Sequence, residues 1–275
     1  MTKTTMIVAT AQAAGSANID DNIAKVERLA GEAAACGAEL VVFPEAMMFD
    51  YTATAEQMAE AAQSHGDIFE KAMLRIAKEK GIALVVGAYA AGKTKLAKNM
   101  MLAIDANGEW LGQYQKLHLY DAFLYQESSK NEPAPLQPDF GELVSFTLGG
   151  FKFGLLNCYD IRFPEISRLL AEQGADALLV ASGWVAGPLK EFHWETLLKA
   201  RAIENTCYVV GSCQPAPLSV GLSMAIDPNG VAVSVVPAGE GLAIATLDHA
   251  RIKTVRDVLP CLEHRRYRIC QPVGV

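Results

Sequence analysis

Short hydrophobic runs alternate with segments of helical periodicity in the first third of the chain. Three apolar runs are typical of buried strands, at residues 6–12, 38–45 and 82–90. Residues 21–37 and 67–81 instead carry apolar side chains at the spacing of an amphipathic helix, and Gly37 can end the first of these helices. Strand, helix, strand, helix, strand predicts an α/β fold built around a sheet.

The second half of the chain repeats features of the first. Residues 101–114 and 223–236 both have the pattern of a hairpin, each with an Asn-Gly pair at its turn. The run GAELVVF (37–43) is echoed by GADALLVAS (174–182). This similarity predicts a four-layer αββα sandwich with pseudo-twofold internal symmetry, in which two sheets face each other and helices lie outside. Because no Pro/Gly/Ser-rich linker interrupts the chain, we expect residues 1–275 to form a single domain.

Two segments depart from this regularity. Residues 127–142 form the longest irregular stretch, and loops of this length in compact domains are usually functional or mobile. The C-terminal segment, at about residues 260–275, lacks clear periodicity. We expect it to be an arm that packs on a neighbouring subunit.

Another apolar run ends at a chemically reactive residue. Residues 151–158 predict a buried strand that stops at Cys158, followed by a short loop and a helix that begins near Pro164. Cys158 is therefore expected at the carboxyl edge of a sheet, where open α/β sheets bind ligands. It would also face the positive end of a helix, which favours the nucleophilic thiolate.

Two other apolar strands end in reactive polar residues, Glu45 and Lys116. If the strand ends lie side by side, Glu45 can act as a general base whose pKa is raised by burial, and Lys116 can stabilise an oxyanion. The N–H of Tyr159 is a second candidate oxyanion donor. Taken singly, Glu45 could cap a turn, Lys116 could be a solvated surface lysine and Cys158 could be a core thiol. Because all three residues end apolar strands, the pattern favours an active site over these separate explanations.

Composition narrows the class of protein. The net charge is −7 without a Lys/Arg block, which argues against a nucleic-acid partner. No apolar run reaches the roughly 18 residues of a membrane span, and the N-terminus lacks the pattern of a signal peptide. The six cysteines and five histidines show no metal-ligand spacing, so we expect no metal and reduced thiols in the cytoplasm.

Three motifs follow one another in the order Glu, Lys, Cys. GAELVVFPE, YQKLHLYD and NCYDIRFPE contain Glu45, Lys116 and Cys158. Together they resemble the motifs of the carbon–nitrogen hydrolase (nitrilase) superfamily, and the resemblance covers nearly the whole chain. It implies an αββα sandwich, a Glu–Lys–Cys triad and a homodimer or higher homo-oligomer. YQES places Glu127 where the family often has a second glutamate, which would orient Lys116 and the attacking water.

The resemblance implies hydrolysis of a non-peptide C–N bond in a small-molecule amide, with no metal or organic cofactor. The Cys158 thiolate would attack the amide carbon, and ammonia would leave with a proton from Glu45. Water activated by Glu45 would then hydrolyse the thioester intermediate.

The residues after Cys158 resemble one branch of the superfamily. CYDIRFPE is similar to the branch that includes omega-amidase and deaminated glutathione amidase. Nitrile-cleaving members more often carry tryptophan and glutamate there, and carbamoyl-amino-acid hydrolases carry two arginines. Arg162 either binds a substrate carboxylate or pairs with an acid such as Glu165. Leu222 stands where the branch often has histidine, which leaves the substrate open.

Two further residues are expected near the substrate. Trp184 either shapes the pocket wall or packs in the core, and His193 lies either at the pocket rim or in helix packing. We favour a small-amide hydrolase over a carbamoyl hydrolase or nitrilase. The alternative from another class is a catalytically silent member that acts as a binding or scaffold protein.

Overall fold

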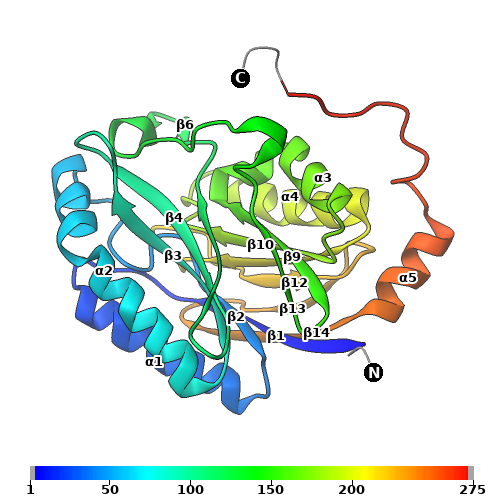
Figure 1. Cartoon of the computed structure of the whole chain (residues 1–275), viewed down its shortest axis with the longest axis horizontal. Helices are drawn as coiled ribbons and strands as arrows, with labels where there is room; N and C mark the ends of the chain where they lie inside the picture. Colours follow the sequence, from blue (N-terminus) through cyan, green and yellow to red (C-terminus); the bar gives the residue numbers. More distant parts are fainter. Residues whose placement is uncertain (1–3, 272–275) are drawn as a thin grey trace.

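Two six-stranded sheets lie face to face in the computed structural model, which describes residues 4–271 (Figure 1). In order across the first sheet, the strands are β14 (Gly241–Asp248), β1 (Thr5–Gln12), β2 (Leu40–Val42), β3 (Ala83–Ala91), β4 (Ala97–Ile104) and β5 (Trp110–Gln115). Across the second sheet they are β13 (Ala232–Val235), β12 (Met224–Ile226), β11 (Tyr208–Cys213), β10 (Ala177–Ser182), β9 (Phe151–Asn157) and β8 (Ser145–Leu148).

The two sheets share one pairing pattern. In the first, β1, β2 and β3 are parallel, β14 pairs antiparallel at one side, and β4 and β5 form an antiparallel hairpin at the other. In the second, β9, β10 and β11 are parallel, β8 is the antiparallel edge, and β12 and β13 form the hairpin. This repetition confirms the predicted pseudo-twofold relation between the sheets.

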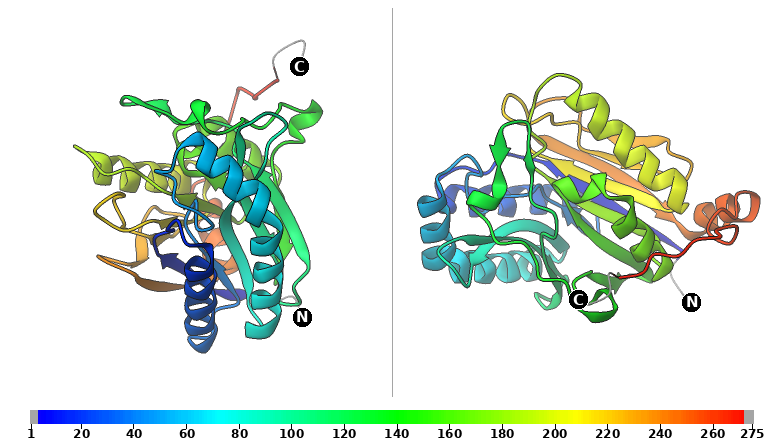
Figure 2. Two further views of the ribbon diagram at one scale, coloured as in Figure 1. Left: turned by 90° about the vertical axis from the view of Figure 1, so that its left-hand side faces the viewer. Right: turned by 90° about the horizontal axis from the view of Figure 1, so that it is seen from above.

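Helices cover the outer face of each sheet (Figure 2). The first sheet is covered by α1 (Ile19–Ala35) and α2 (Ala55–Lys80), and the second by α3 (Pro164–Glu172) and α4 (Lys190–Asn205). The resulting order of layers is helix, sheet, sheet, helix, so the four-layer αββα prediction is confirmed. A further helix, α5 (His249–Val258), follows β14 and was not expected from the sequence.

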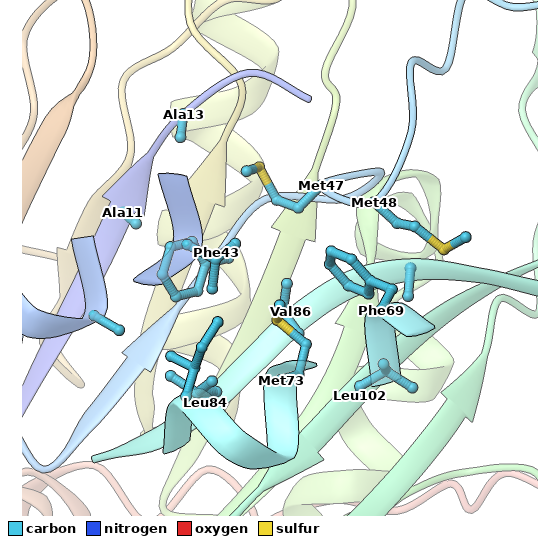
Figure 3. Packing of buried hydrophobic residues seen from close by; sticks show 14 of the residues in the cluster. Ala11, Ala13, Phe43, Met47, Met48, Phe69, Met73, Leu84, Val86 and Leu102 are labelled. Carbon is cyan, nitrogen blue, oxygen red and sulfur yellow. The ribbon is translucent and has the colours of Figure 1, made fainter. Parts of the chain in front are cut away.

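Alternation along the strands separates the layers of the core. In β2, Leu40 and Val42 point into the layer between the sheets, while Val41 points toward the helices. Figure 3 shows Phe69 and Met73 of α2 packed beside strand residues of the first sheet. Because both faces of these central strands are buried, their sequences are continuous apolar runs.

Element boundaries differ from the predictions at two places. Helix α2 begins at Ala55, well before residue 67, because Thr54 caps it by a reciprocal pair of hydrogen bonds with Gln57. Its first turns are rich in alanine and polar residues, so hydrophobic periodicity did not reveal them. Strand β2 ends at Val42, inside the predicted run at residues 38–45, and the following residues lead into the loop that carries Glu45.

The local turn signals of the sequence were correct. Gly108 and Gly230 both adopt φ of 80° at the tips of the two predicted hairpins, and Gly37 follows α1 with φ of 79°. Residues 127–142 contain two 3-10 turns and are otherwise irregular. The C-terminal arm runs from α5 to residue 271 without a helix or strand, and residues 272–275 lie outside the described part (Figure 1).

Candidate active site

One cavity gathers side chains from the loops that follow β2, β5, β9 and β10. Its wall contains all four predicted catalytic residues, Glu45, Lys116, Glu127 and Cys158. It also contains three of the predicted substrate-binding residues, Tyr159, Arg162 and Trp184. The remaining wall comes mostly from tyrosines and polar side chains, namely Tyr51, Tyr89, Tyr120, Tyr125, Asn99, Asn131 and Lys190.

Cys158 directly follows β9 and starts a 3-10 turn, Cys158–Arg162. Its φ of 50° lies in the left-handed region, which costs a non-glycine residue about 1–2 kcal/mol. The buried carboxylate of Asp160 holds the turn, since it accepts hydrogen bonds from the Asn157 N–H at 3.0 Å and the Tyr114 hydroxyl at 2.7 Å. The backbone N–H of His118 donates to the same carboxylate at 3.0 Å.

The Lys116 ammonium lies between two carboxylates deep in the cavity. Its Nζ is 2.8 Å from Glu45 Oε1 and 2.8 Å from Glu127 Oε2, and Lys116 is only 1% exposed. Lysine is almost never buried unless it is paired, so this arrangement rules out a solvated surface lysine. The Gly183 N–H donates to Glu45 Oε2 at 2.8 Å, which ties the carboxylate to the end of β10.

Asn99 connects this group but was not anticipated from the sequence. Its Nδ2 donates to Glu45 Oε1 at 2.8 Å and to Glu127 Oε1 at 3.0 Å. Its Oδ1 accepts from Asn157 Nδ2 at 2.9 Å, one residue before Cys158. The sequence did contain one sign of this role, since Asn99 is a polar residue at a buried position of the apolar strand β4. A buried amide needs hydrogen-bond partners, so other polar groups were to be expected beside it.

The pKa of the Cys158 thiol is raised well above its ordinary value. Burial is the main cause and the negative charge of Glu45 adds to it, while the charge of Lys116 offsets them only in part. The prediction that a helix N-terminus would favour the thiolate is therefore wrong. Helix α3 begins only at Pro164, after the short 3-10 turn.

The pKa of Glu45 lies below its ordinary value, so the prediction of a raised pKa is also wrong. Burial alone would raise it, but the charge and hydrogen bond of Lys116 and the N–H of Gly183 outweigh burial. Conversely, burial lowers the pKa of Lys116, and the charges of Glu127 and Glu45 reverse this and raise it. The site therefore rests with a neutral thiol beside an ionised carboxylate and an ammonium.

Another part of the cavity wall is aromatic and cationic. The Arg162 guanidinium carbon lies 4.6 Å from the centroid of the Trp184 ring, and Trp184 is 4% exposed. Neither Glu165 nor another described acid forms an ion pair with Arg162. His193 does not line this cavity, and its ring lies beside Phe192 on α4.

Neither a metal-binding cluster nor a membrane-spanning helix is found in the described part of the chain. Within residues 4–271, no group of three or more His, Cys, Asp or Glu side chains is placed to hold a metal ion. Over the same residues, no helix has the length and apolar character needed to cross a membrane.

Several known proteins that are similar to this chain are named amidases. The sequence model of the family described as Carbon-nitrogen hydrolase matches residues 7–257. A deaminated glutathione amidase from Escherichia coli is 36% identical over 266 residues, which cover 95% of this chain and 98% of that protein. A deaminated glutathione amidase from Synechocystis sp. is 34% identical over 278 residues, which cover 94% of this chain and 97% of that protein.

Solved structures share the fold. The C. elegans NitFhit protein superposes with a TM-score of 0.86 at 26% identity and covers 97% of this chain and 66% of its own. A mutant amidase of the nitrilase superfamily from Nesterenkonia has a TM-score of 0.82 at 26% identity, over 97% of this chain and 95% of its own. Another mutant of that amidase shows covalent addition of the acetamide moiety of fluoroacetamide at the active site cysteine. With a family match that spans most of its length, the chain belongs to the carbon–nitrogen hydrolase family.

Proposed function

We propose that this hydrolase cleaves a small linear amide of a short carboxylic or dicarboxylic acid to the acid and ammonia. Cys158 is the nucleophile, Glu45 the general base, Lys116 the oxyanion partner, and Glu127 orients Lys116 and the attacking water. The observation that carries the proposal is the buried Lys116 ammonium held between two carboxylates in the same cavity as Cys158. The amidase names of the relatives support the choice of substrate.

The pKa shifts of Cys158 and Glu45 bear on the first step. A thiol with a raised pKa does not pass its proton to a carboxylate with a lowered pKa without a coupled event. We infer that proton transfer from Cys158 to Glu45 accompanies attack on the amide carbonyl. Negative charge then moves to the carbonyl oxygen, where Lys116 and the Tyr159 N–H stabilise it.

The remaining steps return the enzyme to its starting state. Protonated Glu45 gives its proton to the leaving nitrogen, the C–N bond breaks, and ammonia departs from the thioester. Glu45 next takes a proton from water, and the resulting hydroxide attacks the thioester carbon. The C–S bond breaks, the acid is released, and the proton returns to the Cys158 sulfur. Amide and water are consumed, and acid and ammonia are formed.

A single variant tests the nucleophile. We expect Cys158→Ala to lower the turnover number by at least about 10⁴-fold with an unchanged circular dichroism spectrum, because loss of a nucleophile removes the covalent route. Ammonia release is measured across short amides, dicarboxylate monoamides, carbamoyl amino acids and nitriles, and carbon dioxide distinguishes carbamoyl cleavage from amide cleavage.

The matched control is Cys207→Ala, because Cys207 is a fully buried thiol that does not line the cavity. It should lose some stability and keep its turnover number per folded molecule. Near-wild-type rates in Cys158→Ala would overturn the assignment. A wild-type protein that releases ammonia from no member of the panel would favour the silent binding or scaffold alternative.

We also propose that the protein works in the cytoplasm as a homodimer or higher homo-oligomer, supported by the family resemblance and by the exposed arm. Tyr267 of this arm is 91% exposed, and Gln271 hydrogen-bonds to Gln137 and Asp139 of its own chain. We expect sedimentation at micromolar concentration to give a dimer or a larger species. A monomer under these conditions would count against this proposal.

A further inference from the structure

Lys190 is a cation in the cavity wall for which the amide chemistry above has no role. It is the first residue of α4, is 6% exposed and lines the same cavity as Cys158. Its Nζ donates to the Tyr120 hydroxyl at 2.8 Å and lies 3.7 Å from the centroid of the Phe123 ring. The ammonium is thus held in place by groups that carry no negative charge.

This is a costly position for an ammonium. The first turn of a helix carries the positive end of its dipole, which disfavours a cation. Burial and the positive charge of Arg162 both lower the pKa of Lys190. Within the described chain, no carboxylate forms an ion pair with Lys190. Because an uncompensated buried charge is strongly unfavourable, the position indicates that an anion from outside the chain completes it.

The backbone before Lys190 is also strained. Leu189 has φ of 62°, in the left-handed region, while its side chain is 68% exposed and gains little from burial. The Trp184 indole N–H donates to the Lys190 carbonyl at 3.0 Å and fixes the start of the helix. Strain of this kind persists where the surrounding structure requires it, and it is often found at ligand sites.

Arg162 adds a second cation to the same region. The Arg162 guanidinium carbon lies 4.6 Å from the Trp184 ring centroid, and Lys190 Nζ lies 6.0 Å from it. Arg162 Nε and Nη2 are buried without a hydrogen-bond partner among residues 4–271. Two cations with free donor capacity therefore lie beside one aromatic ring in the cavity wall, and both suit a carboxylate ligand.

We propose that Lys190 is a specificity-determining residue that, with Arg162, binds a carboxylate on the acyl part of the substrate. The inference rests on the proposed amide hydrolysis. Glu45 and Glu127 pair with Lys116 in the cavity of Cys158, whereas Lys190 and Arg162 lie beside the Trp184 ring in the wall of the same cavity. An amide with a distal carboxylate is therefore bound with its amide toward Cys158. The reverse orientation would place the carboxylate beside Glu45 and Glu127, which repel it, and would leave Lys190 and Arg162 without an anion.

The test compares an acidic amide with a neutral amide of the same size. Succinamate and succinamide differ only in a carboxylate against a carboxamide, and glutaramate and glutaramide form a longer pair. We expect wild-type kcat/KM to favour the acidic member of at least one pair by about tenfold or more, after the twofold statistical correction for the diamide. Lys190→Met should lower this preference at least about tenfold, and Lys190→Arg should keep most of it.

Lys130→Met is the matched control, since it removes the same charge close to the site. Lys130 Nζ donates to the Ala53 carbonyl and lies 5.1 Å from the Tyr125 ring centroid, but Lys130 does not line the cavity. It should leave the preference between the paired amides unchanged. This control separates a direct contact with the substrate from a general effect of net charge.

Two results would overturn the role of Lys190 while leaving amide hydrolysis intact. These are a wild-type enzyme without the preference, and a Lys190→Met variant that retains it, whether its rates with both amides are unchanged or fall equally. If Lys190→Met does not fold, Lys190→Gln and the wild-type preference decide the question. Failure of the wild type to cleave any amide would instead contradict the proposed function itself.

Discussion

At the scale of single residues, the charge of Lys116 organises the inner cavity. A buried ammonium is costly by several kcal/mol, and here two carboxylates at 2.8 Å offset that cost. Burial raises the pKa of the Cys158 thiol, and the negative charges of the carboxylates add to this more than Lys116 offsets it, which helps to keep the thiol neutral. The neutral thiol is therefore a weak nucleophile by itself. It reacts when a substrate carbonyl is present whose oxygen can take up the negative charge.

Asn99 provides a test of this arrangement. We expect Asn99→Ala to lower kcat by about 10–100-fold with a smaller change in KM, because Glu45 and Glu127 lose a shared donor that positions them. It should also lower the free energy of unfolding by about 1–3 kcal/mol, since polar groups are left unsatisfied. Ammonia-release kinetics and urea unfolding measure the two effects.

Asn205→Ala is the control for buried amides outside the cavity. Asn205 is fully buried and donates to the Arg201 carbonyl at 2.9 Å within α4. We expect this variant to lose stability and to keep its kcat. If both variants reduced kcat to the same extent, Asn99 would have a general structural role and not a positioning one.

At the scale of elements, one glycine allows a strand and a catalytic loop to come close together. Gly87 lies in β3 where the chain around Glu45 crosses it, and its N–H donates to the Pro44 carbonyl at 3.1 Å. A Cβ at this position would lie 2.5 Å from both the Ala46 nitrogen and the Pro44 oxygen. Both are backbone atoms, so the loop would have to move to make room.

We therefore expect Gly87→Ala to displace Glu45 and to lower kcat/KM by about 100-fold or more, because small misplacements of a catalytic group are costly. Overpacking should also destabilise the fold by about 1–3 kcal/mol. Gly66→Ala is the control, since a Cβ there meets only the Tyr89 carbonyl oxygen at 3.5 Å, an ordinary contact. Unchanged activity in Gly87→Ala would show that the loop tolerates the shift.

Elements were predictable where their signals are local. The central strands follow from apolar runs, and the two hairpins follow from Asn-Gly turns at residues 107–108 and 229–230. The start of α2 at Ala55 was missed because its first turns carry alanine and polar side chains rather than a clear apolar stripe. Helix α5 was missed because only two of its residues, Ile252 and Val255, are buried.

At the scale of the whole molecule, the distribution of charge matters more than its sum. The chain has a net charge of −7, yet its cavity presents Arg162 and Lys190 beside Trp184 as well as Glu45 and Glu127 beside Lys116. This separation arises because loops after strands of both sheets meet at one place. The net charge therefore affects which class of partner the protein attracts. The positions of the charges in the cavity wall affect how a substrate is oriented.

The sequence by itself determined the αββα architecture, its internal repetition and the three strand-end residues Glu45, Lys116 and Cys158, because apolar periodicity, turn residues and short motifs are local properties. The tertiary structure decided the rest. Asn99 and Lys190 line the cavity because segments that are far apart in the chain pack together. The directions of the pKa shifts of Glu45 and Cys158 also depended on it, since burial and the distances to neighbouring charges exist only in the folded protein.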